Sequence, residues 1–302
     1  MPTDVALPLR VGARTVWTVR RRLVRRRLSL DEALGDAVPA LLPLAGHEHG
    51  YLITGLPEAV AQQLILRRRS MAAFVRQRYR RSFARLDQAF DLYFEGFSAK
   101  SRSTCRRKLR RFAERSGGTI HVRMFAAEHE ILGFYEGART VSRKSYQERL
   151  LDSGLPAGAE ALADMRASAR AGKLRSWLLY LDGAPIAYLH APAEGDALVY
   201  AHLGYDPDFA DLSPGTVLQL EAMRMLMAER RFRLFDFTEG EGQHKRLFST
   251  GGIDCVDLLL LRPTLANLAI GHALGRFDDT VAFAKKVVSA FGVGTLVRRL
   301  RR

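Results

Sequence analysis

The sequence predicts a mixed α/β protein of the α+β type, in which helices flank a central, mostly antiparallel sheet. The first observation is a run of three apolar segments between residues 177 and 204, separated by the turn sequences Asp182-Gly183 and Glu194-Gly195-Asp196. Asp-Gly between two apolar runs is a strong signal for a β-hairpin. The second observation is that long segments before and after this region repeat their apolar residues at helical spacing. The chain therefore combines consecutive antiparallel strands with amphipathic helices.

Composition limits the class of protein. The 302 residues suffice for one large domain or two small ones, and 47% hydrophobic residues can form a sizeable core. The formal net charge of +15 predicts an anionic partner: nucleic acid, an anionic lipid surface or a phosphorylated cofactor. The only cysteines, Cys105 and Cys255, form no CxxC pair, so we expect no metal site, redox motif or disulfide framework. No signal peptide or membrane-spanning run is visible, which predicts a cytoplasmic protein, soluble or peripheral on the inner membrane.

The first part of the chain alternates strand-like and helix-like segments. Residues 1–28 hold eight arginines and one acid, and residues 11–24 are predicted to form a strand. This strand is either a solvated basic edge or a surface that binds phosphates. Ser29 is a plausible N-cap for the helix that follows. The next segments are a strand at 50–55, a helix at 57–66, and a segment at 73–84 in which strand and helix spacing compete and a strand is favoured.

Residues 86–115 end in a basic amphipathic helix. Cys105, Leu109 and Phe112 lie on one face of this helix, whereas Arg106 lies among the basic residues elsewhere on it. Gly117-Gly118 ends the helix. The segments that follow are a strand at 119–125, helices at 128–151 and 158–171, and strands at 177–181, 186–191 and 197–204.

Residues 199–248 carry the features around which we expect the chain to be organised. A strand ends at Tyr205-Asp206-Pro207, Ser213-Pro214-Gly215-Thr216 opens a long helix, and residues 233–237 form a short strand. A glycine-rich turn then leads to His244-Lys245, and a final strand at 255–261 precedes the tail. The order is strand, loop, helix, strand, loop, helix.

The start of the long helix has the chemistry of a phosphate site. A helix N-terminus presents unpaired N–H groups and a partial positive charge. Ser213 can cap the helix, Pro214 fits its first turn, Gly215 leaves room for a phosphate, and Thr216 adds a hydroxyl. The same residues are also an ordinary helix start. Only the order of the surrounding elements favours phosphate binding.

Several short sequences in residues 172–262 point together to one family. They are Gly183-Ala-Pro-Ile-Ala187, Tyr205-Asp206-Pro207, Ser213-Pro214-Gly215, Asp236-Phe237, and Gly242 with Lys245. This set resembles the second half of a GNAT-fold acyltransferase, in particular the subgroup of the CelD-type cellulose-biosynthesis proteins, and is distantly similar to Fem-type peptidoglycan aminoacyltransferases. The basic helix resembles the corresponding helix of the subgroup, which extends the resemblance to residues 86–262.

The resemblance implies a GNAT-like acyltransferase core at 86–262. It would lie between an N-terminal α/β portion at 1–85, which could be a partial GNAT-like half, and an amphipathic basic helical tail at 263–302. The central sheet would splay after its fourth core strand, and acyl-CoA would enter there as the acyl donor, with no metal. The implied cofactor-binding residues are Leu212, Ser213, Pro214, Gly215, Thr216 and Val217, near whose backbone N–H groups the pyrophosphate would sit, together with Lys245.

The resemblance also directs attention to residues for catalysis and substrate binding. The catalytic candidates are His244, Asp236, Glu239 and Tyr205, and the substrate-binding candidates are Tyr146, His190, His202 and Arg106. The subgroup often has Tyr-Lys where this chain has His244-Lys245. Imidazole titrates near neutral pH, so His244 could serve as the general acid in place of the tyrosine. Each candidate also has a structural explanation, such as strand-end packing for Tyr205.

The tail, residues 265–302, repeats apolar residues on one helical face and ends in arginines. Such a helix can lie in a membrane interface or pack on the core of its own protein. The first hypothesis is therefore an acyl-CoA-dependent N-acyltransferase at an anionic membrane surface. Its amine acceptor would be a sphingoid base, as for a bacterial ceramide synthase-like enzyme, or an amino sugar of the envelope.

Two further hypotheses remain. One is Fem-type transfer from aminoacyl-tRNA to a peptidoglycan precursor, which would require tRNA binding through the arginine-rich surfaces. The other is a noncatalytic basic protein that binds a membrane or nucleic acid. Nucleic acid is the less expected partner, because the arginine runs lack regularly interleaved aromatic residues for base stacking.

Overall fold

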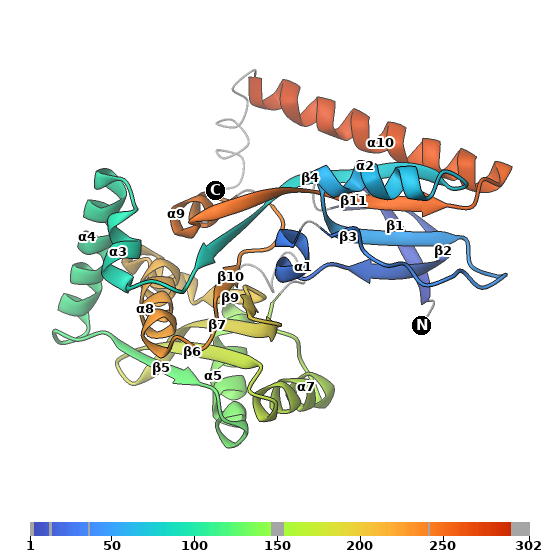
Figure 1. The fold of residues 1–302 in the computed structure, drawn as a ribbon. Coiled ribbons are helices and arrows are strands. Elements are labelled where there is room, and N and C mark those ends of the chain that lie inside the picture. The colour runs from blue at the N-terminus through green and yellow to red at the C-terminus, as the bar shows by residue number, and fades with distance from the viewer. Residues whose placement is uncertain (1–2, 12–13, 36, 146–153, 241, 291–302) are drawn as a thin grey trace. The chain divides into compact units, whose positions relative to one another are not determined.

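The computed structural model describes residues 3–11, 14–35, 37–145, 154–240 and 242–290 (Figure 1). A large, mostly antiparallel sheet flanked by helices confirms the predicted mixed α/β class. The chain forms two units, which we call unit 1 (residues 1–79 with 254–302) and unit 2 (residues 80–253). Strands β4 (Ala72–Arg85) and β11 (Gly251–Leu261) each contribute residues to both units. The domain limits expected at 85/86 and 262/263 stay predictions.

Unit 1 has helices on both faces of its strands. Strand β2 (Arg14–Arg27) pairs antiparallel with β1 (Thr3–Val11) and parallel with β3 (Gly50–Pro57), which pairs antiparallel with β11. Leu64 of α2 (Glu58–Arg67) packs with Ile53 on one side, and Leu274 of α10 (Leu265–Ala290) packs with Leu261 on the other. Helix α1 (Leu30–Leu34) begins with the predicted cap, because Ser29 Oγ accepts the Glu32 N–H at 3.2 Å.

The sheet of unit 2 also separates two layers of helices. From β4 the strand order is β10 (Leu234–Asp236), β8 (Ala197–Val199), β7 (Ala184–Glu194), β6 (Leu174–Leu181) and β5 (His121–Phe125). Residues of β6 alternate between the two cores: Trp177 and Leu179 pack with α8 (Pro214–Glu229), whereas Leu178 packs with α5 (Ile131–Lys144). The α8 layer includes α3 (Phe90–Glu95) and α4 (Ala99–Arg115), and the α5 layer includes α7 (Ala159–Arg170).

The strand expected at 197–204 is divided into two. Strand β8 pairs parallel with β10 as far as Val199, and the Tyr200 N–H continues this contact by donating to the Asp236 carbonyl at 2.8 Å. The Ala201 N–H then donates to the His190 carbonyl at 3.2 Å, and β9 (His202–Tyr205) follows β7. Apolar alternation continues through the break, so the sequence pattern did not reveal it. The strand thus leaves β10 after Tyr200, which is the splay that the resemblance implied.

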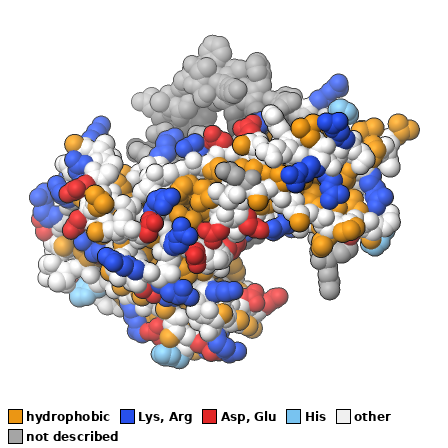
Figure 2. Space-filling view, viewed as in Figure 1, with side chains coloured by type: hydrophobic (Ala, Val, Ile, Leu, Met, Phe, Trp, Pro, Cys, Tyr) orange, Lys and Arg blue, Asp and Glu red, His pale blue; other side chains and the backbone are white. Residues whose placement is uncertain are grey.

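Other expected elements differ mainly at their ends. The ambiguous segment at 73–84 is the strand β4, as favoured. The helix predicted from residue 128 begins with a 3-10 turn (Glu128–Glu130), continues as α5 and ends at Lys144, and the rest of its predicted range, 146–151, lies outside the described residues. The glycine-rich turn leads to the short helix α9 (Gln243–Phe248). Basic side chains are spread over the whole face drawn in Figure 2 rather than gathered in one patch.

Gly204 should be sterically required in β9. A Cβ atom at this position would lie 2.5 Å from Cε1 of Tyr188, whose ring is fully buried on the neighbouring strand. We expect Gly204→Ala to lower the free energy of unfolding by about 1–3 kcal/mol, because overpacked cores must shift backbone or rotamers. Urea unfolding measures this. Gly133→Ala, in α5 with nothing within 4 Å of the new methyl, is the matched control and should not destabilise. Equal effects of the two substitutions would contradict the steric explanation.

Candidate functional site

The start of α8 is built differently from the predicted cap. Ser213 is the N-cap residue, but it adopts a left-handed conformation (φ 55°, ψ 47°) and its side chain makes no capping hydrogen bond. Its carbonyl instead accepts the N–H groups of Thr216 at 3.0 Å and Val217 at 3.2 Å. Pro214 has no N–H to offer. Fewer backbone donors therefore point out of this helix start than the sequence suggested, and the charge for an anion must come largely from side chains.

Gly215 brings α8 close to β9. A Cβ atom at this position would lie 3.2 Å from Cδ2 of Leu203 and 3.5 Å from Cδ1 of Tyr205. The glycine thus serves the packing of helix on strand, in addition to the open approach expected for a phosphate. Tyr205 packs here at the end of β9, half-buried, which is the structural explanation considered for it.

A pocket of about 600 Å³ lies beside the start of α8. Its walls come from one face of α4, from Thr216 and from α9; the lining residues are Lys100, Ser101, Thr104, Cys105, Lys108, Thr216, His244, Arg246, Leu247 and Phe248. Lys100, Thr104 and Lys108 are four residues apart and so share one helix face. The Lys108 ammonium donates to Thr216 Oγ1 at 3.1 Å. Three cations meeting a helix N-terminus form a site suited to a phosphorylated ligand.

Sequence reasoning missed most of this pocket. It identified α4 as basic and selected Arg106, but Arg106 is exposed, lies over the Phe94 ring at 5.6 Å, and does not line the pocket. The spacing of Lys100, Thr104 and Lys108 was the available signal. It became meaningful only when the structure showed which face of α4 meets α8.

His244 stands at the wall of the pocket near the point where the strand bends. Its ring centroid lies 5.7 Å from that of Tyr200, the residue at the break between β8 and β9. Burial, together with neighbouring Lys245, lowers the pKa of His244 below its ordinary value. The imidazole is therefore neutral near pH 7 and suited to accept a proton. Burial raises the pKa of Tyr200, whose phenol stays protonated and can donate.

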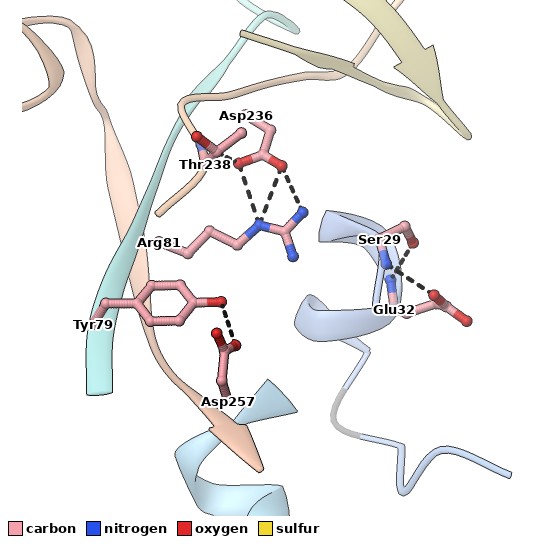
Figure 3. A network of polar contacts seen from close by, with 7 residues as sticks. All are labelled: Ser29, Glu32, Tyr79, Arg81, Asp236, Thr238 and Asp257. Atoms are coloured by element: carbon pink, nitrogen blue, oxygen red, sulfur yellow. Dashed lines mark hydrogen bonds and ion pairs between the residues drawn. The ribbon is translucent and has the colours of Figure 1, made fainter. Parts of the chain in front are cut away.

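Asp236 is held in a buried ion pair at the end of β10 (Figure 3). The Arg81 Nε donates to Asp236 Oδ1 at 3.2 Å and to Oδ2 at 3.1 Å, and the Thr238 N–H donates to Oδ1 at 2.8 Å. Both partners are almost completely buried, so removing either would leave an uncompensated charge. The carboxylate stabilises the turn after β10, and its predicted part in catalysis stays a prediction. Nothing in the sequence marked Arg81 as its partner.

The Lys245 side chain reaches the backbone of Glu239 and does not line the pocket. The Lys245 ammonium donates to the Glu239 backbone carbonyl, while the Glu239 side chain is exposed. Burial lowers the pKa of Lys245, against the opposing effect of Glu239 and Asp236. The pocket cation from α9 is Arg246, next in sequence to the residue selected.

His190 and His202 lie together on the α5 side of the sheet. They face each other across β7 and β9, with ring centroids 6.1 Å apart, and His190 Nδ1 is 3.0 Å from Ser176 Oγ. The His190 ring also stacks on Phe134 at 5.9 Å. Tyr146, the remaining substrate-binding candidate, lies outside the described residues. Of the residues selected from the sequence, the structure thus brings Thr216 and His244 to one pocket, whereas His190 and His202 lie on the opposite face of the sheet, beside α5.

The described residues contain neither a cluster of metal ligands nor a membrane-spanning helix. In this part of the chain no three His, Cys, Asp or Glu side chains are placed to hold a metal ion. Within the same residues, no helix has both the length and the low polarity that crossing a bilayer requires.

Comparison with known proteins agrees with this architecture. Residues 99–246 match the family described as acetyltransferase (GNAT) domain. The structure resembles the C-terminal domain of a protein named as a lysylphosphatidylglycerol synthetase from Agrobacterium fabrum (13% identity, 78% of this chain and 73% of that chain, TM-score 0.52). It also resembles FemX (12% identity, 71% of this chain and 72% of that chain, TM-score 0.53). No curated protein matches the sequence.

These comparisons show that the chain contains a GNAT-type acetyltransferase domain, which confirms the family-level resemblance seen in the sequence. At such low identities the two solved structures show the fold alone. The similarity to the CelD-type subgroup stays a prediction.

His190 predicts a pH dependence of stability. Burial, with the neighbouring His202, lowers the pKa of His190 to about 3. Between pH 6.5 and 3 the unfolded chain binds a proton at His190 that the folded chain does not bind. The contribution of neutral His190 to the free energy of unfolding is therefore complete above pH 6.5 and decreases as the pH falls toward 3. We expect a loss of roughly 2.5 kcal/mol between pH 7 and 4.5, measured by urea unfolding. The substitution His190→Gln should make the free energy of unfolding depend less on pH, whereas the exposed control His121→Gln should not change this dependence. If His190→Gln left the pH dependence unchanged, His190 would not be its source.

Proposed function

We propose, from the GNAT-type acetyltransferase domain at residues 99–246, that this protein transfers an acyl group from acyl-CoA to an amine. The observation that carries the proposal is the pocket in which Lys100, Lys108 and Arg246 meet the start of α8. Coenzyme A carries a pyrophosphate and a further phosphate, so a cluster of cations beside a helix N-terminus suits it.

The donor would be held mainly by side chains. Lys108 is already fixed by its hydrogen bond to Thr216 Oγ1, and can bind a phosphate with its other two protons. Arg246 offers a guanidinium that can form two parallel hydrogen bonds to phosphate. Of the residues 212–217 that were expected to bind phosphate, Thr216 lines the pocket, and the N-terminus of α8 adds its partial positive charge. The pantetheine arm of CoA would run through the opening between β9 and β10.

The chemistry needs two proton transfers. The amine nitrogen attacks the thioester carbonyl carbon, the C–N bond forms, and the C–S bond breaks to leave the CoA thiolate. Neutral His244 can accept the proton that the amine loses. Tyr200, which stays protonated, can give a proton to the thiolate. The rings of these two residues are 5.7 Å apart, close enough for both to act at one reacting centre.

The acceptor is proposed to be an amine of a membrane or of the cell envelope. A sphingoid base would give a ceramide-like lipid, as the resemblance to a bacterial ceramide synthase-like enzyme of the CelD-type subgroup suggests, and an envelope amino sugar is the other acceptor considered. Support comes from the net charge of +15, which favours an anionic surface, and from the fold neighbour whose name contains a lipid. The protein would then work in the cytoplasm, peripherally on the inner membrane.

A second candidate is transfer from an aminoacyl-tRNA. It is favoured by the fold similarity to FemX and by the same cationic pocket, since RNA also presents phosphates. This candidate differs from transfer from acyl-CoA in the molecule that donates the acyl group, so measuring which donor the protein binds distinguishes the two candidates.

The first test concerns donor binding. Lys108→Ala and Arg246→Ala should each weaken CoA binding about tenfold, because each removes a charge-assisted hydrogen bond worth roughly 1.5 kcal/mol. Isothermal titration calorimetry with CoA measures this. Arg107→Ala is the matched control, since Arg107 is exposed on α4 and does not line the pocket. If wild-type protein binds no acyl-CoA but binds aminoacyl-tRNA, the second candidate replaces the first.

The second test concerns turnover. His244→Gln should leave CoA binding nearly unchanged and slow the release of free CoA thiol about a hundredfold, because it removes a proton acceptor without removing a pocket cation. Thiol should appear only when both acyl-CoA and an amine are present. An unchanged rate in His244→Gln would show that this residue is not the base. Mass spectrometry of acyl-CoA that co-purifies with the protein would identify the acyl chain.

A further inference from the structure

The pocket beside α8 has an inner and an outer end, which differ in exposure. At the inner end the Lys108 ammonium donates to Thr216 Oγ1 at 3.1 Å, and Lys108 is partly buried. At the outer end Lys100, in the first turn of α4, lines the pocket and is exposed. The two lysines are eight residues apart in one helix, so their Cα atoms lie about 12 Å apart along its axis. The cationic wall of the pocket therefore extends over about two turns of α4.

Helix α9 forms the other wall of the outer end. Phe97 lies just before α4, and its ring centroid is 6.0 Å from that of Phe248, the last residue of α9. The Tyr93 hydroxyl also donates to the Phe248 carbonyl at 2.7 Å. These contacts fix the end of α9 against the start of α4, and Phe248 lines the pocket together with Lys100. Since none of the contacts involves Lys100, a substitution of this exposed residue should leave the packing intact.

The outer end is positively charged and has no carboxylate to balance it. None of the residues that line the pocket is acidic, and α4 has no acidic residue in its first turn. Within the described residues, the Lys100 ammonium takes part in no ion pair or hydrogen bond. Thr104, one helical turn further on the same face, adds a hydroxyl that can donate a hydrogen bond. A lysine and a hydroxyl in this arrangement suit the oxygens of a phosphate.

We propose that Lys100 binds the 3′-phosphate of CoA, and this inference rests on the proposed function. CoA carries its pyrophosphate on the 5′ oxygen and a phosphate monoester on the 3′ oxygen of one ribose, so the ring holds the two groups apart. The pyrophosphate takes the inner end, where the N-terminus of α8 adds its partial positive charge to that of Lys108. The monoester, on the other side of the ribose, then lies toward the outer end, where Lys100 pairs with it.

This assignment gives Lys100 a part in selecting the donor. The 3′-phosphate is remote from the thioester, so it contributes binding energy without taking part in the bonds that form and break. An aminoacyl-tRNA presents a different pattern, because its internal phosphates are diesters and the terminal ribose that carries the aminoacyl ester has no phosphate monoester. A preference for the 3′-phosphate therefore favours acyl-CoA over aminoacyl-tRNA as the donor.

The experiment is isothermal titration calorimetry of the full chain with CoA and with dephospho-CoA, which lacks only the 3′-phosphate. We expect the wild type to bind CoA about tenfold more tightly, because one charge-assisted contact is lost with the phosphate. Lys100→Ala should weaken the binding of CoA about tenfold and leave that of dephospho-CoA nearly unchanged, so that the preference disappears. Lys108→Ala should weaken the binding of both ligands by a similar factor and keep the preference, because both carry the pyrophosphate.

The matched control is Arg107→Ala, which removes an exposed charge of the same helix outside the pocket and should keep both affinities. Equal affinities of the wild type for the two ligands, or a preference that survives in Lys100→Ala, would overturn the role of Lys100 while CoA binding still supported the proposed function. Loss of the preference in Lys108→Ala or in Arg107→Ala would overturn it as well, by placing the 3′-phosphate elsewhere or by showing a general effect of charge. If the wild type binds neither ligand, the proposed donor is wrong and the role of Lys100 is wrong with it.

Discussion

The departure of the bent strand from β10 is the constraint on which the candidate site depends. Up to Val199 the strand pairs with β10, and the Tyr200 N–H still reaches the Asp236 carbonyl; from Ala201 onward the hydrogen bonds go to β7. Because backbone groups must be paired, this exchange of partners lets the sheet open without leaving buried donors unsatisfied. Tyr200 consequently sits at the opening, where its ring meets that of His244.

Two glycines of the same region allow close packing on both faces of β9. Gly204 leaves room for the Tyr188 ring on the α5 side, and Gly215 lets the start of α8 lie against Leu203 and Tyr205 on the other side. The Arg81–Asp236 pair fixes the turn after β10, which leads to α9. Packing and one buried ion pair therefore set the walls of the pocket, and α4 and α9 then supply its cations.

Local signals in the sequence were sufficient to predict most of the helices and strands. Asp182 and Gly183 both have positive φ, as a two-residue hairpin turn requires, and Ser29 forms the cap expected of it. The candidate site was harder to predict, because its residues are far apart in the sequence and come together only in the folded chain. Arg81 and Asp236 are 155 residues apart in sequence, and Lys108 meets Thr216 across 108 residues. The basic residues of α4 occupy every side of the helix except its apolar face, so only the packing of α4 on α8 could distinguish Lys108 from Arg106.

The same packing changes the chemical argument at His244. A histidine in place of a tyrosine suggests a general acid when only the sequence is considered. Desolvation, however, disfavours the charged imidazolium and the charged phenolate, so His244 is held neutral and can accept a proton, while Tyr200 is held protonated and can donate one. Two groups whose pKa values move apart in one place can divide the two proton transfers of amide formation between them. The splay of the strand, which brings these two rings together, thereby connects the fold to the proposed chemistry.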